Sequence, residues 1–123
     1  MKLSKTEEEL MNHLWSKKRA FMKDLLDCYP EPKPASTTIA TLLKRMIDKG
    51  FVAYKTYGKS REYYPLVEKS SYFSKHVNGL IKNFFNDSAS QFASFFTRET
   101  ELSESELLEL RKIIDGEIKK KES

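Results

Sequence analysis

Apolar residues in the first thirty positions recur at helical spacing in two groups. A helix from Lys5 to Ser16 is predicted, because Ser4 and Glu7 form a capping box ahead of an apolar series. That series consists of Leu10, Met11, Leu14 and Trp15. A second series predicts a short helix that ends near Cys28. Its members are Phe21, Met22, Leu25 and Leu26.

A third helix is predicted after a loop in which Pro30, Pro32 and Pro34 prevent the second helix from continuing. Ser36 is placed to cap its first free amides, and Gly50 ends it as a left-handed cap residue. Its apolar arc comprises Ile39, Leu42, Leu43, Met46 and Ile47. Its polar arc comprises Thr37, Thr41, Lys44 and Asp48, with Arg45 beside them. The helix should therefore bury one face and expose a stripe of hydroxyls and charges.

A β-hairpin is predicted directly after this helix. The segments Phe51 to Thr56 and Arg61 to Leu66 are rich in aromatic and β-branched residues, which favour strands. Residues 57–60 between them include Gly58 and form the turn. The cations around the tip of the hairpin are Lys55, Lys59 and Arg61.

The predicted fold is mostly α with a small β-hairpin, and its order of elements is that of an N-terminal winged helix-turn-helix. In that arrangement the last helix enters the major groove of DNA, where Arg, Lys and Thr contact base edges and phosphates, and the wing cations neutralise phosphates. The residues predicted to contact double-stranded DNA are Ser36, Thr37, Thr38, Thr41, Lys44, Arg45, Lys55, Lys59 and Arg61. An amphipathic surface helix beside a purely structural hairpin is the alternative that this pattern leaves open.

Charge is distributed unevenly along the 123 residues. Residues 1–66 hold 13 Lys and Arg against 8 Asp and Glu, whereas residues 67–123 hold 9 against 10. A modest basic surplus is often only a solvated face, and it favours nucleic acid here because it coincides with the helix and hairpin. The DNA-binding domain is predicted to span residues 1–67.

Composition argues against several other classes of protein. No apolar stretch is long enough to span a membrane, and the first nine residues are polar, so we expect a cytoplasmic protein without membrane insertion. Cys28 is the single cysteine, and His13 and His76 lie in separate predicted helices, so neither a metal site nor a cofactor is expected. Phosphate-binding loops and nucleophile elbows do not occur in the sequence, so an enzyme is not predicted.

Residues 68–123 are predicted to form a helical dimerisation domain. A long helix over about 69–86, a short helix and a final helix follow one another, and the final helix begins with a capping box of Ser103 and Glu106. Their apolar stripes are predicted to bury against a second copy of the chain, whereas packing back on the winged helix of the same chain is the alternative. The interface residues predicted are Phe73, Val77, Leu80, Ile81, Phe84, Phe85, Phe92, Phe95, Phe96, Leu107, Leu110 and Ile114.

Three segments together resemble the BlaI/MecI/CopY family of bacterial repressors. Residues 35–51 are ASTTIATLLKRMIDKGF, residues 61–67 are REYYPLV, and residues 8–15 are EELMNHLW, with the family's terminal tryptophan of the first helix. The similarity continues to the last helix and covers nearly the whole chain. Each motif is weak alone, but their order and spacing are specific.

The resemblance implies a homodimeric repressor that binds an inverted-repeat operator, of a β-lactamase or antibiotic-resistance type in the penicillinase branch. The family's groove-facing threonines correspond to Thr38 and Thr41, and its recognition-helix arginine corresponds to Arg45. Ala40 departs from the family, because the penicillinase and methicillin repressors place a cation there. An alanine cannot donate a hydrogen bond, so the operator of those repressors is not assumed.

The resemblance also implies how such a repressor is switched. In the penicillinase branch a membrane sensor protease inactivates the repressor by cutting the dimerisation domain, and alignment on Leu102 and Ser103 places the cleavage site near Phe95 and Phe96. Phe95 stands where the family has asparagine. The copper branch uses a C-terminal cysteine cluster, which this sequence lacks, so a copper sensor is not predicted.

Two other functions are compatible with the sequence. One is a protein-interaction module, in which the winged helix is a docking surface and does not bind specific DNA. The other is an unrelated winged-helix regulator with a small-molecule pocket between its helical domain and wing. Replacing Arg45 and Thr41 with alanine distinguishes the repressor from the interaction module, because only the repressor would lose operator binding.

Overall fold

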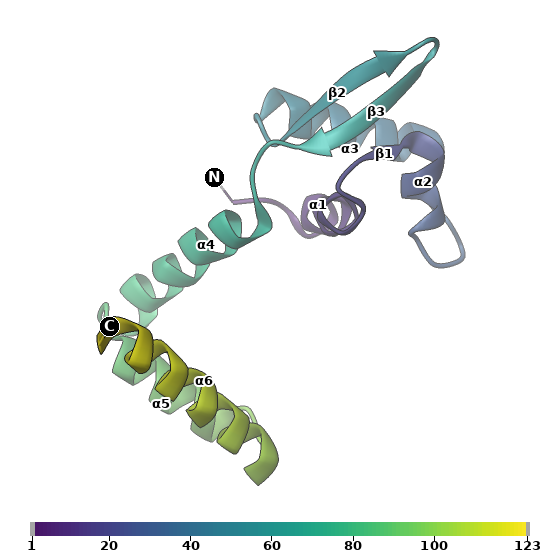
Figure 1. The fold of residues 1–123 in the computed structure, drawn as a ribbon. Helices are drawn as coiled ribbons and strands as arrows, with labels where there is room; N and C mark the ends of the chain where they lie inside the picture. The colour runs from purple at the N-terminus through teal and green to yellow at the C-terminus, as the bar shows by residue number, and fades with distance from the viewer. Residues whose placement is uncertain (1, 123) are drawn as a thin grey trace. The chain divides into compact units, whose positions relative to one another are not determined.

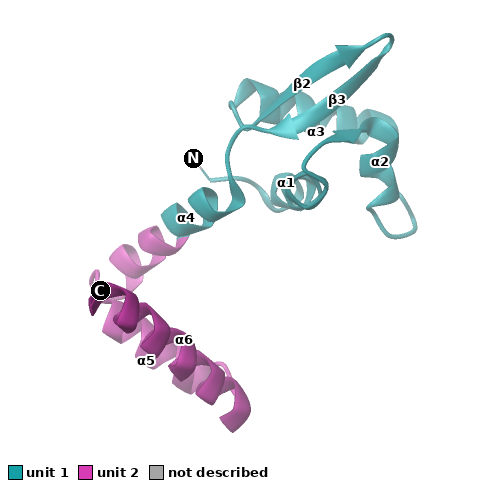
Figure 2. Ribbon diagram, in the orientation of Figure 1, with its two compact units in different colours: residues 1–76 teal, residues 77–123 magenta. Residues whose placement is uncertain are grey.

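Helices and one small sheet follow each other in the order α1–β1–α2–α3–β2–β3–α4–α5–α6 (Figure 1). The structure, a computed structural model, describes residues 2–122. It divides within α4 into two compact units, residues 1–76 and 77–123 (Figure 2). The elements are α1 (Lys5–Lys17), β1 (Ala20–Phe21), α2 (Met22–Asp27), α3 (Ser36–Asp48), β2 (Val52–Tyr57), β3 (Ser60–Pro65), α4 (Lys69–Phe84), α5 (Ala89–Glu99) and α6 (Glu104–Glu122).

The first unit is a winged helix, as predicted, with a three-stranded antiparallel sheet in the order β1-β3-β2. The predicted hairpin is confirmed, and its two strands close on a two-residue turn in which Tyr57 pairs with Ser60. Gly58 takes φ +61° at the first turn position, a conformation that glycine adopts without strain. Strand β1 was not predicted, because two residues are too few to show a periodic pattern.

The core of this unit lies between α1, α2, α3 and the inner face of the sheet. The predicted apolar stripe of α3 is confirmed: Ile39, Leu42, Leu43 and Met46 are buried, and Ile47 is partly buried against them. Burying each such side chain stabilises the fold by roughly 1.5–3 kcal/mol. The orientation of α3 about its own axis is therefore fixed by four side chains that face inward.

The predicted cap of α3 is wrong. Ser36 is the first residue of the helix, and Ala35 holds the N-cap position with extended backbone and no capping side chain. The amides of Thr38 and Ile39 bond to the Ala35 carbonyl, at 3.0 and 3.3 Å. The helix begins one residue early because Ala35 leaves the proline-containing loop in an extended conformation, so Ser36 already has helical geometry.

A buried ion pair joins the start of α1 to the end of α3. Glu7 is only 2% exposed, and its carboxylate completes the predicted capping box by accepting from the Ser4 amide at 2.8 Å. The Lys49 ammonium donates to both carboxylate oxygens, at 2.9 and 2.8 Å. The bond from Lys49 is the main reason that the pKa of Glu7 lies below its ordinary value of 4.5, with the Ser4 amide second.

Two further contacts attach the end of the sheet and the start of α4 to α1. The indole nitrogen of Trp15 donates to the Val67 carbonyl at 2.8 Å. Tyr72 on α4 is buried; its hydroxyl accepts from the Leu3 amide at 3.1 Å and donates to Glu8 at 2.9 Å. The first two turns of α4 thus belong to the winged-helix unit.

The second unit contains the end of α4 with α5 and α6. Its helices match the prediction, and the capping box of α6 is confirmed by reciprocal bonds of 3.0 and 3.1 Å between Ser103 and Glu106. Within the described residues, neither α5 nor α6 has a buried side chain. A single copy therefore leaves the apolar faces of these two helices largely in contact with solvent.

Removing the partner of Glu7 tests the buried ion pair. We expect Lys49→Met to lower the free energy of unfolding at pH 7 by about 1–3 kcal/mol, because a buried carboxylate loses its cation. Since the folded pKa of Glu7 is depressed, the stabilisation is complete above pH 4.5 and is lost as the pH falls through the folded pKa. The variant should therefore lose less stability than the wild type upon acidification.

Urea denaturation at pH 7 and at several values below pH 4.5 measures both effects. Lys5→Met, at an exposed lysine of α1, is the control. Equal stability of Lys49→Met and Lys5→Met across this range would contradict a stabilising role for the pair.

Candidate nucleic-acid interface

The exposed face of α3 is the first part of the candidate site. Because its apolar residues face the core, the polar residues half a turn away face solvent. All of the α3 residues predicted to contact DNA are exposed: Ser36, Thr37, Thr38, Thr41, Lys44 and Arg45. Asp48 and Ala40 share this exposure. The structure thus collects hydroxyls, two cations, one carboxylate and one methyl side chain on the exposed surface of one helix, and a single helix is what a DNA major groove admits.

Thr41 lies near the middle of this surface with its hydroxyl already engaged. Its Oγ1 donates to the Thr37 carbonyl at 3.0 Å, a bond common for threonine inside helices. The hydroxyl oxygen can still accept a hydrogen bond, and the γ-methyl lies on the same exposed side chain. In this rotamer the Thr41 side chain can accept a hydrogen bond from a base or contact a thymine methyl group. It is less suited to donating a hydrogen bond to a base.

The start of α3 adds positive potential to the same surface. Ala35 offers no capping side chain, so the first amides of the helix are not satisfied by a side chain. The hydroxyls of Ser36 and Thr37 are exposed beside them. Free amides, the helix dipole and nearby hydroxyls together favour an anion such as a phosphate.

The wing does not gather its three predicted cations on one face. Lys55 pairs with Glu62 across the strands, whereas Arg61 pairs with Thr56. Since neighbouring residues of a strand point to opposite faces, Lys55 and Arg61 lie on opposite sides of the hairpin. Lys59 lies in the turn between them, and all three are exposed.

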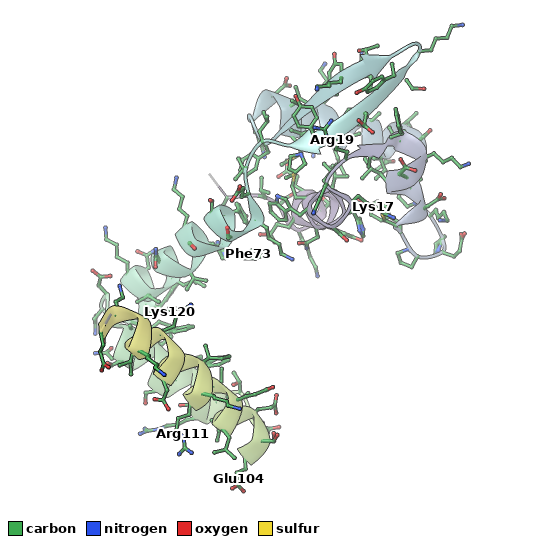
Figure 3. All side chains as sticks on the ribbon, viewed as in Figure 1. Lys17, Arg19, Phe73, Glu104, Arg111 and Lys120 are labelled. Carbon is green, nitrogen blue, oxygen red and sulfur yellow. The ribbon has the colours of Figure 1, made fainter. Side chains whose placement is uncertain are left out.

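Aromatic rings hold the guanidinium groups at the sheet. The Arg61 guanidinium lies over the Tyr54 ring, 4.4 Å from its centroid. The guanidinium of Arg19, which Figure 3 labels beside the sheet, lies 5.7 Å from the centroid of Tyr64. Arg19 also lies 3.9 Å from the Glu62 carboxylate. Stacking of this kind restricts an arginine and leaves less entropy to lose upon binding. Sequence analysis missed Tyr54, although the predicted turn fixes the register that places it diagonally across from Arg61.

The residues predicted for dimerisation lie on α4, α5 and α6. Phe73 has a contact within its own unit, because its ring lies 6.2 Å from that of Trp15. In the second unit, the Phe85 ring lies 5.5 and 5.4 Å from those of Phe92 and Phe95. Ile81, Phe85, Phe92 and Leu110 are partly buried. The residues that are more than a third exposed are Phe73, Val77, Leu80, Phe84, Phe95, Phe96, Leu107 and Ile114.

The two histidines have aromatic neighbours. The His13 ring lies edge-on to Tyr29 at 4.5 Å, and His76 stacks on Tyr72 at 6.2 Å. Burial raises the pKa of Tyr29 to about 12, helped by the negative charge of Glu9. Burial is also the main cause that raises the pKa of Tyr72.

Across residues 2–122, no three His, Cys, Asp or Glu side chains converge in a way that would hold a metal ion.

None of the helices described in residues 2–122 combines the length and the apolar character that crossing a membrane requires. This observation concerns the helices only.

Known proteins resemble this chain over most of its length. The profile of the penicillinase repressor family matches residues 3–116. The methicillin resistance regulatory protein MecI of Staphylococcus aureus strain N315 is 32% identical over 114 residues, which cover 92% of this chain and 93% of MecI. The penicillinase repressor of Bacillus licheniformis is 25% identical over 114 residues, covering 92% of this chain and 89% of that repressor.

Among solved structures, the DNA-binding domain of the repressor BlaI superposes with a TM-score of 0.51 at 25% sequence identity. The superposition covers 58% of this chain and 88% of the BlaI domain.

Proposed function

Because the chain belongs to the penicillinase repressor family, we propose that it is a transcriptional repressor that binds an operator in double-stranded DNA as a homodimer. The observation that carries the proposal is the exposed polar face of α3, held outward by the buried stripe on its opposite side. Thr38, Thr41 and Arg45 contact base edges in the major groove, and Lys44 with the start of α3 contacts phosphates. The wing residues Lys55, Lys59 and Arg61 neutralise the neighbouring backbone.

The domain boundary follows from these roles. Residues 1–67 form the DNA-binding domain and residues 68–123 the dimerisation domain, although the first turns of α4 pack against the winged helix through Tyr72. A helix shared in this way allows dimerisation to constrain the position of the winged helix. The alternative, a winged helix that docks another protein, is an outcome of the test below.

Dimerisation is supported by the apolar surface that one copy exposes. Phe84 is 75% exposed and Ile113 is 60% exposed, and both lie in a unit whose helices α5 and α6 have no buried side chain among the described residues. Exposed apolar surface on this scale marks an interface, and each Å² that a second copy covers contributes roughly 25 cal/mol. A two-fold homodimer covers the same surface on both chains and pairs two α3 helices with two half-sites.

The operator is proposed to be an inverted repeat within an antibiotic-resistance or β-lactamase regulon. The names of the relatives, which refer to methicillin resistance and penicillinase, support this class of gene. Ala40 is exposed on α3 beside Thr41 and cannot donate a hydrogen bond, so the operator sequence of repressors with a cation there is not assumed for this chain.

A membrane sensor protease is proposed to inactivate the repressor by cutting near Phe95 and Phe96. Both side chains are exposed on α5, a helix of eleven residues with no buried side chain among those described. Such a helix opens at low cost, which a protease requires in order to bind an extended substrate. A cut at this point would separate α6 from the rest of the chain and weaken the dimer.

Alanine substitutions on α3 test DNA recognition. We expect Thr41→Ala and Arg45→Ala each to weaken binding to the gene's own promoter by about 10- to 100-fold, since a good base contact contributes roughly 1–3 kcal/mol. Binding to random duplex should fall much less. Lys5→Ala, which removes an exposed charge outside the site, is the control.

Fluorescence anisotropy with promoter and random duplexes makes the comparison. If the two α3 variants bind promoter as the wild type does but lose a protein partner, the winged helix is a protein-interaction module.

A charge in the proposed interface tests dimerisation. We expect Ile114→Glu to convert the dimer into a monomer at about 10 μM, because the carboxylate would be buried without a partner. Affinity for a duplex with two half-sites should then fall by about 10²-fold or more, since two linked sites no longer bind together. Lys112→Glu is the control, because residues two apart lie on nearly opposite sides of a helix.

Sedimentation velocity gives the oligomeric state of both variants. A monomeric wild type, or an Ile114→Glu variant that remains dimeric, would refute this interface.

Proteolysis is tested by incubating the protein with its proposed partner, a cognate membrane sensor protease. We expect its activated form to produce an N-terminal fragment ending near Phe95, identified by intact-mass spectrometry, and to leave Phe95→Pro uncut because proline blocks the extended geometry that proteases bind. Cleavage elsewhere, or none, would reject the proposed site.

A further inference from the structure

A basic hollow lies between the start of α2 and the wing. Its volume is about 450 Å³, and its lining includes three cations, Lys23, Lys59 and Arg61, with Phe21, Ser60 and Tyr63 between them. Lys23 comes from α2, and the other two cations come from the hairpin. No carboxylate lines the hollow among the described residues.

The two walls of the hollow are fixed relative to each other. Strand β1 pairs with β3 through Ala20 and Tyr63, and α2 begins directly after β1. The Phe21 ring packs edge-on against Tyr57 of the wing, with centroids 6.2 Å apart. The backbone just before Lys23 is therefore paired with β3, and this pairing holds the start of α2 beside the wing.

The acidic residues that neighbour these cations in the sequence do not line the hollow. The Asp24 carboxylate accepts from the Phe21 amide at 2.9 Å, which closes the first turn of α2. Glu62 is adjacent to Arg61 but is not part of the lining, and its carboxylate lies 3.9 Å from the Arg19 guanidinium. The positive charge of the hollow is thus not neutralised by a carboxylate in its lining.

Three cationic residues that line one hollow without a carboxylate in its lining give it positive potential, which favours an anion. Arg61 is already oriented by its contact with Tyr54, so it loses less freedom when an anion binds. In a helix-turn-helix the helix before the recognition helix crosses the DNA backbone, and α2 occupies that place before α3. A phosphate of the duplex is the anion that this placement brings to the hollow.

We propose that this hollow is a binding site for a DNA backbone phosphate, and that Lys23 is an additional phosphate-contacting residue. The inference rests on the proposed function and extends the DNA contact surface beyond α3 and the wing to α2. Since a phosphate carries no sequence information, the site adds affinity equally on every duplex and sets the position of the protein on the backbone.

Charge removal at Lys23 tests the site through salt dependence. A plot of log Kobs against log[salt] has a negative slope for a protein that binds DNA phosphates. We expect Lys23→Gln to make this slope less negative by about 0.9, the value for one phosphate contact, on promoter and random duplexes alike. Lys5→Gln, outside the hollow, should keep the wild-type slope. Lys23 is exposed, so both variants should unfold at the wild-type temperature.

Each other outcome would overturn the proposal. Identical slopes for Lys23→Gln and Lys5→Gln would show that Lys23 contacts no phosphate, and a loss confined to the promoter would make Lys23 a base contact. Saturable binding of inorganic phosphate at micromolar concentration, lost in Lys23→Gln, would make the hollow a site for a small anion. If the wild type shows no preference for its promoter, the proposed function fails, but the slopes on random duplex still decide the role of Lys23.

Discussion

The burial of one face of α3 is the constraint on which the rest of the molecule depends. Ile39, Leu43 and Met46 are almost fully buried, so the helix cannot rotate about its axis without exposing them to water. Every polar residue of the opposite face is consequently exposed, and its direction is set by packing. The proposed DNA-contacting surface is thus oriented by the hydrophobic core itself.

Polar contacts then hold the ends of α3 and its neighbours in place. Lys49 follows the last turn of α3 and bonds to Glu7, whose carboxylate also caps α1. Trp15 fixes the segment after the wing, and Tyr72 fixes the start of α4. These contacts join the recognition helix, through α1, to the helix that leads toward the second unit. Within the first unit, α3 and the start of α4 are thus both bonded to the segment that contains α1.

Sequence analysis succeeded where structure is local. The α3 stripe, the hairpin around Gly58 and both capping boxes depend on neighbours in sequence, and all are present. The prediction failed at the N-cap of α3, which is Ala35 and not Ser36, and it failed where distant residues decide. The bond between Glu7 and Lys49 spans 42 positions, and β1 exists only because Ala20 and Phe21 meet β3. The predicted basic tip did not specify a face, and the strand register places Lys55 and Arg61 on opposite sides of the hairpin. Lys23 lies beside the hairpin cations only through the fold, because α2 and the hairpin are far apart in the sequence.

In the proposed complex, two copies of this chain place two α3 helices in successive major grooves of one operator. Hydroxyl-radical footprinting on the gene's own promoter is the sharpest test of this arrangement. We expect two protected segments of related, inverted sequence, with centres about 10 base pairs or a multiple of this apart, because a symmetric dimer contacts one face of the duplex. Protection of a single half-site, or uniform protection that random duplex shows equally, would contradict it.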